Sequence, residues 1–265
     1  MHLAHPLGVQ MLSYPRVKND ERDAADLADL LRMGRLPEAW IAPPATRELR
    51  GWVRHRAKLV GLRSGLKCQV HAVLAGAGVQ VSMSDLFGAG GQQLLATTRP
   101  AVESRPRVDS LLWMITALDF GIDTFARLVT GRLRTDPGYR AIQVIPRVGP
   151  LLAVVFAAEI GDIIRFTRPQ QLASWAGLTP KHHESDTTVH RGRITKQGSR
   201  LVRWAAVEAV QRVPAHTRLG QIRDRVGERR GNRNIGAVAA ARELITLVFY
   251  ALRDHHIRCP SAQAM

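Results

Sequence analysis

The sequence predicts a mainly α-helical protein, and two observations carry this prediction. Apolar residues recur at helical spacing in stretches that begin near Ala45, Val108, Val148, Ser199 and Gly236. A strand is expected at one place, Gly8–Leu12, which is a short apolar run between two prolines. We therefore expect three parts, which are residues 1–40, a long helical arm over residues 41–140, and a helical C-terminal domain over residues 141–258.

The first part should contain a helix over Asp20–Met33, with Asp20 as its N-cap and Gly34 at its end. Its apolar positions keep helical spacing at Ala24, Leu27, Ala28 and Leu31. The next stretch should be a rigid connector, because it contains Pro37, Pro43 and Pro44.

The arm is expected to consist of two long helices, from Ala45 to about Leu74 and from about Val108 to Leu133. The first is strongly basic, with Arg47, Arg50, Arg54, Arg56, Lys58, Arg63 and Lys67. A glycine-rich break at Gly88–Gly91 separates the two helices, which favours an antiparallel hairpin or coiled-coil arm.

The charge balance indicates a nucleic-acid partner. The 265 residues contain 38 Lys and Arg against 22 Asp and Glu, a formal net charge of +16. Basic surfaces bind phosphates by releasing counterions, so we expect Arg47, Arg50 and Arg54 to contact nucleic acid. An anionic membrane surface is the alternative, but aromatic residues make up only 5% and the longest apolar run, Leu151 to Ala158, is too short to span a bilayer.

Two cysteines that lie far apart, Cys68 and Cys259, fit a reduced cytoplasmic protein and exclude a cysteine-based zinc site. The first residues show neither the charged region nor the apolar region of a signal peptide.

Two short patterns have both a structural and a functional interpretation. Asp20 and Asp23 are three residues apart at a helix start, where acidic residues stabilise the helix but could also bind a divalent metal. Ile145–Pro150 precedes an apolar helix; it is either an ordinary helix start or a helix-hairpin-helix element that binds a DNA phosphate near Gly149.

The densest pattern runs from Trp175 to Arg203 and contains Ser185 in a polar loop. Ser185 is either an ordinary loop serine or a nucleophile beside a phosphate site, and Ser199 should cap the following helix. The candidate phosphate-binding cations are Arg191, Arg193, Lys196, Arg200 and Arg203. We expect the three histidines of this block to be solvated, and the charge run around Arg223 and Arg229 to be a solvated face.

This block resembles the C-terminal domain of the IS110 (IS116, IS902) family of insertion-sequence transposases. The resemblance rests on Ile145-Pro146-x-Val148-Gly149, Glu159-Ile160-Gly161-Asp162, Arg165-Phe166, Gln171-Leu172-Ala173, Gly177-Leu178-Thr179-Pro180, Ser185 and Gly192 to Gly198. Lys18-x-Asp20-x-x-Asp23-Ala24 resembles the end of the family's RuvC-like DEDD domain, and Pro44 to Leu74 resembles its helical middle.

The resemblance implies a recombinase that cuts and rejoins DNA with a serine nucleophile, Ser185, and a metal-binding carboxylate set that includes Asp20 and Asp23. It implies Mg²⁺ as the metal, a structured RNA encoded by the element as guide, and a homo-oligomer on DNA. Residues 1–40 would then be a remnant of the RuvC-like domain, and residues 141–258 the serine-bearing transposase domain.

The family's first Asp and its Glu lie upstream of the segment that begins here, so we expect this copy to be truncated at its N-terminus and inactive alone. Two alternatives remain open. The chain could be a catalytically dead nucleic-acid-binding remnant, or a DNA-binding protein built on the helix-hairpin-helix element.

Overall fold

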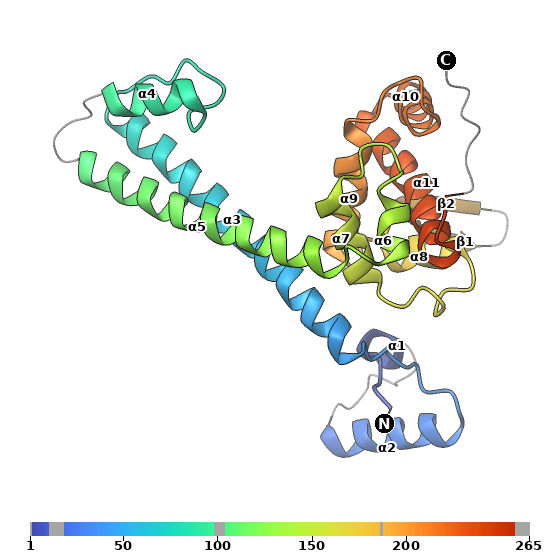
Figure 1. Cartoon of the computed structure of the whole chain (residues 1–265). Coiled ribbons are helices and arrows are strands. Elements are labelled where there is room, and N and C mark those ends of the chain that lie inside the picture. Colours follow the sequence, from blue (N-terminus) through green and yellow to red (C-terminus); the bar gives the residue numbers. More distant parts are fainter. Residues whose placement is uncertain (1, 11–18, 98–103, 186–187, 258–265) are drawn as a thin grey trace. The chain divides into compact units, whose positions relative to one another are not determined.

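The computed structural model describes residues 2–10, 19–97, 104–185 and 188–257, and for residues 97, 182–185 and 188–191 it describes the backbone alone. The prediction of a mainly helical protein is confirmed, because helices account for most of the described residues (Figure 1). The chain divides into two compact units, Met1–Arg47 and Glu48–Met265. The larger unit contains both the long arm helices and the C-terminal helices.

Among the described residues, the smaller unit contains two complete helices, α1 (Pro6–Gln10) and α2 (Asp20–Arg32). The strand expected at Gly8–Leu12 is therefore wrong for Gly8 to Gln10, and Met11 and Leu12 lie outside the described residues. A proline suits the first turn of a helix because it lacks an N–H that would need a partner there. The extended backbone lies earlier in the chain, where Ala4 forms a single antiparallel bridge with Glu38.

The N-cap of helix α2 lies one residue earlier than expected. Asn19, not Asp20, has the extended backbone of an N-cap, and its Oδ1 accepts a hydrogen bond from the N–H of Arg22 at 2.9 Å. No residue of α2 is buried, so its apolar stripe of Leu27 and Leu31 is exposed.

The arm consists of α3 (Pro44–Gly76) and α5 (Arg105–Arg132), with the short helix α4 (Ala89–Thr97) between them. The two long helices form an antiparallel pair, as expected (Figure 1). Near α4 they enclose a small core that includes Val70, Leu74, Leu86, Leu95, Val108, Leu111 and Ile115. Farther from α4, an ion pair between Arg63 of α3 and Asp119 of α5 connects the two long helices.

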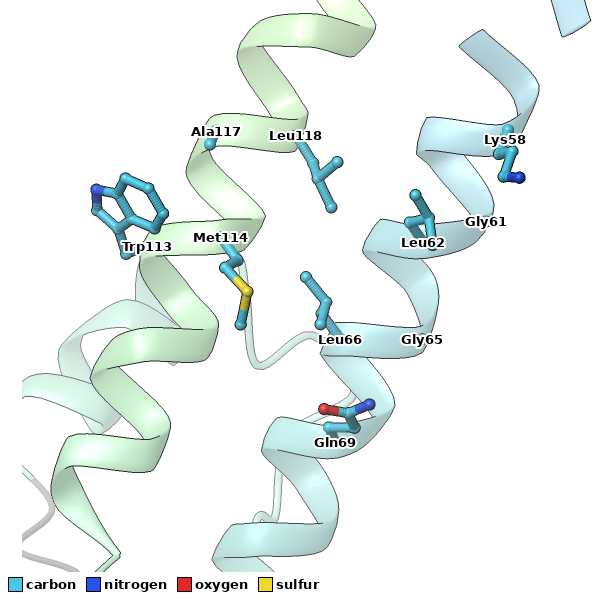
Figure 2. A pocket seen from close by; sticks show the side chains of 10 residues that line it. All are labelled: Lys58, Gly61, Leu62, Gly65, Leu66, Gln69, Trp113, Met114, Ala117 and Leu118. Carbon is cyan, nitrogen blue, oxygen red and sulfur yellow. The ribbon is translucent and has the colours of Figure 1, made fainter. Parts of the chain in front are cut away.

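A shallow apolar groove of about 770 Å³ lies between α3 and α5 (Figure 2). The leucine side chains of both helices point into the groove. Gly61 and Gly65 line its α3 side and place no side chain in it. At its edge the side chain of Trp113 is 73% exposed.

The C-terminal bundle contains helices α6 (Pro137–Ile142), α7 (Pro150–Ile160), α8 (Pro169–Trp175), α9 (Arg200–Gln211), α10 (Arg218–Arg230) and α11 (Arg233–Asp254). The expected helix starts near Val148, Ser199 and Gly236 are confirmed within one turn, whereas α6, α8 and α10 were not expected. The largest buried side chains include Phe156 of α7 and Phe249 of α11. These two helices therefore form the centre of the bundle.

Helix α11 has the length and apolar composition of a membrane-spanning helix, and it is the one such helix among the described residues. Half of its most apolar stretch is buried, against α6, α8, α9 and α10. It therefore packs as the core helix of the bundle.

Candidate serine hairpin and nucleic-acid interface

The polar segment around Ser185 forms a β-hairpin, so the expectation of a polar loop is wrong. Strand β1 (Pro180–Ser185) pairs antiparallel with β2 (Thr188–Ile194), with Ser185 opposite Thr188 and His183 opposite His190. Ser185 is the last residue of β1 and stands next to residues 186 and 187, which lie outside the described part. The backbone therefore places the candidate nucleophile at the tip of a two-stranded projection.

The base of this hairpin is fixed by backbone contacts between the segments on either side of it. The N–H of Thr195 donates to the carbonyl of Thr179 at 2.9 Å, and that of Lys196 donates to the carbonyl of Gly177 at 3.1 Å. The two segments approach so closely that a Cβ on Gly198 would lie 1.7 Å from the carbonyl oxygen of Trp175. Gly198 also has a φ of +77°, which only glycine adopts readily.

Arg203 of α9 braces this base from inside. Its Nη1 donates to the carbonyl oxygens of Ala176 at 2.9 Å, Gln197 at 2.7 Å and Gly198 at 3.3 Å. Burial lowers the pKa of Arg203, and the positive charge of Arg200 lowers it further. The sequence suggested a phosphate contact for Arg203, but the structure uses this guanidinium to hold the hairpin base.

A buried carboxylate lies beneath the hairpin base. Glu159, at the end of α7, is 3% exposed, and its Oε2 accepts a hydrogen bond from the Ser199 hydroxyl at 3.0 Å. Ser199 also caps α9, as expected, by accepting from the N–H of Val202. Arg54 of α3 completes the network, with Nε 2.7 Å from Oε1 and Nη2 3.0 Å from Oε2 of Glu159.

Two of the arm arginines that were expected to bind nucleic acid therefore make internal contacts. The hydrogen bond with Glu159 raises the pKa of Arg54. Arg50 donates to the carbonyl oxygens of Ala158 and Glu159, both at 2.8 Å, and burial lowers its pKa. The Arg50 guanidinium satisfies carbonyls at the end of α7 that have no partner within the helix, whereas that of Arg54 pairs with the Glu159 carboxylate. Arg47, one turn earlier, is exposed.

The other candidate cations lie on the outside of the hairpin base. Arg193, Lys196 and Arg200 are exposed, and their side chains form no hydrogen bond or ion pair with any residue that the structure describes. Arg191 lies on β2, but its side chain is outside the described part. The hairpin base thus combines an internally braced backbone with free positive charge on its surface.

Gly149 lies in a short connection between α6 and α7. It is the N-cap of α7, and a Cβ added to it would meet nothing within 4 Å. The connection is closed by a hydrogen bond from the N–H of Val148 to the carbonyl of Ile145, and Arg147 has a φ of +66°. The backbone N–H groups at the start of α7 are thus approachable.

Asp20 and Asp23 are both exposed in the first turn of α2, in the smaller unit. Their carboxylate oxygens are ligands of the type that Mg²⁺ prefers. Two carboxylates are too few to hold the ion alone, and within the described ranges no three His, Cys, Asp or Glu side chains gather into a metal site. These two residues could thus supply only part of a magnesium site.

Two family models match two separate parts of the chain. One, described as "Transposase IS116/IS110/IS902 family", matches residues 139–226 and includes the serine hairpin with its base. The other, for DEDD transposases of IS110 elements, matches residues 5–78 and includes Asp20 and Asp23. The chain belongs to the IS116/IS110/IS902 transposase family.

Similar proteins agree with this family. The chain is 26% identical to a protein of Pseudomonas aeruginosa named as a family 20 transposase, over 75% of this chain and 61% of that protein. It is 29% identical to a protein of Sinorhizobium fredii named as a transposase, over 78% of this chain and 50% of that protein. It is 24% identical to the transposase of insertion sequence IS1111A from Coxiella burnetii, over 76% of this chain and 56% of that protein. The matches thus span only half to three fifths of these family members.

Proposed function

We propose that this family member acts on DNA by phosphoryl transfer, with Ser185 as the nucleophile. The observation that carries the proposal is the position of Ser185 at the tip of a hairpin whose base is rigid inside and cationic outside. Covalent catalysis needs a nucleophile that is held within reach of the phosphate, and a braced support supplies that positioning.

The proposed reaction consists of two displacements at one phosphorus atom. In the first, Ser185 Oγ loses its proton and bonds to a DNA phosphorus, while the bond from phosphorus to one strand oxygen breaks and that oxygen takes up a proton. In the second, a hydroxyl group of another strand end attacks the same phosphorus, and Ser185 Oγ leaves and regains a proton. The serine ester conserves the energy of the cleaved bond, so rejoining needs no nucleotide cofactor.

The exposed cations at the hairpin base would neutralise the phosphate in both displacements. Arg193, Lys196 and Arg200 are free to do so, and Arg191 of β2 is the fourth candidate. Guanidinium and ammonium groups stabilise the charge that develops on phosphoryl oxygens in the transition state.

Asp20 and Asp23 would hold Mg²⁺ together with further carboxylates. When bound, this ion stabilises charge on the attacking and leaving oxygens of a phosphoryl transfer. The two aspartates contribute oxygen ligands on consecutive positions of one helix face, since residues three apart on a helix are neighbours. A structured guide RNA and a homo-oligomer on DNA complete this proposal, and both rest on the family resemblance.

The experiment is the search for a protein–DNA adduct that survives denaturation. The chain is extended upstream with the family's strands that carry its first Asp and its Glu. It is then incubated with Mg²⁺, the transcript of its element and labelled DNA that carries the element ends, and boiled in detergent. We expect an adduct that disappears in Ser185→Ala and persists in Ser174→Ala, which removes an exposed serine of α8. An equal adduct in all three proteins would overturn the assignment of Ser185.

A nucleic-acid-binding protein without chemistry is the second candidate. It is favoured by one observation, that the carboxylates of the described residues form no group of three. The connection between α6 and α7 would then act as a helix-hairpin-helix element, with the free N–H groups behind Gly149 on a phosphate. DNA binding without any adduct, and its loss on substitution of Arg147 and Gly149, would support this candidate against the first.

A further inference from the structure

The turn between α10 and α11 carries a dense group of arginines that the serine hairpin does not use. Between Arg225 and Arg233 the sequence contains four arginines and one glutamate, Glu228. All four arginines, which are Arg225, Arg229, Arg230 and Arg233, are exposed. In Figure 1 α10 lies at the top of the bundle, away from β1 and β2. We call these four residues the turn arginines.

The turn arginines differ from most other arginines of the bundle, which have partners inside the protein. Arg223 of α10 donates to the carbonyl oxygens of Val210 and Val213 and pairs with Asp224, so its expected place on a solvated face is wrong. Arg218 pairs with Glu243. The guanidiniums of the turn arginines form no hydrogen bond or ion pair with a residue in the described ranges, although the charge of Arg233 lowers the pKa of Asp224. Their donors are therefore available to a ligand.

Their support is rigid. Helices α10 and α11 cross so closely that a Cβ on Gly236 would lie 2.1 Å from the carbonyl oxygen of Arg223 and 2.9 Å from the nitrogen of Gly227. The side chain of Asn232 caps α11 by accepting from the N–H of Asn234 at 2.9 Å, and its own N–H donates to the carbonyl of Gly227 at 3.0 Å. A fixed backbone presents the four side chains without an ordering cost for the turn itself.

The composition of the turn points to one kind of ligand. Four guanidiniums on one turn suit several phosphates of one backbone, because arginine binds phosphate through paired hydrogen bonds. Proteins that hold single strands add aromatic side chains on which bases stack. The described stretch from Thr217 to Gly236 contains no aromatic residue. We infer that the turn arginines are a second DNA-contacting surface, which grips the backbone of double-stranded DNA away from the serine hairpin.

This inference goes beyond the proposed function, because it does not depend on Ser185 or on chemistry. It can therefore be tested in a Ser185→Ala background, in which binding is measured without an adduct. The charge of Glu228 and of Asp224 opposes phosphate, and the four turn arginines outnumber these two carboxylates.

The experiment compares the salt dependence of binding to a duplex DNA of random sequence. Removing three phosphate contacts by Arg229→Ala, Arg230→Ala and Arg233→Ala together should reduce the slope of log K against log salt by about 2 to 3. The matched control removes the same total charge from exposed arginines of α5, by Arg107→Ala, Arg127→Ala and Arg132→Ala. We expect the control to keep most of the slope, and replacement of the three turn arginines by lysine to keep most of it too.

Three outcomes would overturn the inference. Equal losses in the turn and control variants would mean that only net charge matters. A loss confined to single-stranded DNA or hairpin RNA, tested as competitors, would assign the surface to those ligands instead. An unchanged slope at an unchanged melting temperature would remove the surface from nucleic-acid binding altogether, and the Ser185 adduct would remain a separate question.

Discussion

Arg54 and Glu159 form a two-pronged ion pair between helix α3 of the arm and the end of helix α7, although 105 residues separate them in the chain. Their exposure is unequal, since 60% of the Arg54 side chain is accessible and only 3% of that of Glu159. The ion pair thus joins a largely solvated guanidinium to a carboxylate that is buried in the bundle.

Removing this arginine should destabilise the bundle. Arg54→Ala leaves the buried carboxylate with the hydroxyl of Ser199 and the nearby charge of Arg50. We therefore expect the free energy of unfolding to fall by about 2 to 3 kcal/mol, less than for a fully buried pair because Arg54 is solvated. Urea denaturation measures it. The control is Arg212→Ala, which removes an exposed partner of Glu208 and should cost about 0.5 kcal/mol or less. A cost for Arg54→Ala as small as the control's would contradict this account.

The hairpin base should not tolerate a side chain at Gly198. Gly198→Ala combines a positive φ with a Cβ that would meet a backbone oxygen, so a loss of more than about 2 kcal/mol is expected. Gly65→Ala is the opposite case, because Gly65 lies in the exposed interior of α3 with nothing within 4 Å of its Cβ position. It should stabilise α3 by about 0.5 to 1 kcal/mol. Thermal unfolding of both variants checks this, and a melting temperature of Gly198→Ala at or above that of the unchanged protein would refute the close packing at Gly198.

Arg200 and Arg203 are neighbours on α9, but their replacement should affect different properties, DNA binding for Arg200 and stability for Arg203. Arg203→Ala leaves three carbonyls of the hairpin base without their donor, which should cost about 1 to 3 kcal/mol of stability. Arg200→Ala should change stability by no more than about 0.5 kcal/mol. It should instead lower the slope of log K against log salt for DNA binding by about 1. We would measure stability and the salt slope of DNA binding for both variants. Equal changes in the two variants would rule out separate roles for Arg200 and Arg203.

The cations of β2 and the following loop should bind DNA rather than stabilise the fold. Arg193→Ala with Lys196→Ala is expected to lower the same slope by about 2, without a change in melting temperature, because both side chains are exposed. Fluorescence anisotropy across a salt series checks this. The reference is Arg134→Ala with Arg140→Ala, a pair of exposed arginines at the junction of arm and bundle. If the reference pair lowers the slope as much, the hairpin base has no special part in binding.

The long helices could be predicted from the sequence because their apolar spacing is local information. The short helices α6, α8 and α10 were missed, since proline, glycine and arginine weaken the helical pattern over so few residues. The hairpin was missed because residues 180–194 are polar and lack the alternation of a half-buried strand. The strand expected at Gly8–Leu12 failed for the opposite reason, because an apolar run of five residues fits a helix equally well.

The candidate site was predicted in a different way. Ser185, Asp20 and Asp23 were singled out by resemblance to a family motif, and their chemical roles stay predictions. Spacing could not reveal that Arg50, Arg54 and Arg203 make internal contacts, because their partners depend on how distant segments pack. One signal was present for Glu159, a lone carboxylate at the end of the apolar sequence Leu151–Ile160.

The glycine at position 198 also bears on how copies of such an element decay. Any change at the first or second base of a glycine codon replaces the residue, and at this position a replacement collides with the backbone of Trp175. A copy can therefore lose the folded hairpin base while its codons for Ser185, Asp20 and Asp23 stay intact. In a genome that accumulates mutations, an undamaged set of codons for the candidate site residues is thus a poor guide to which copies still encode a folded protein.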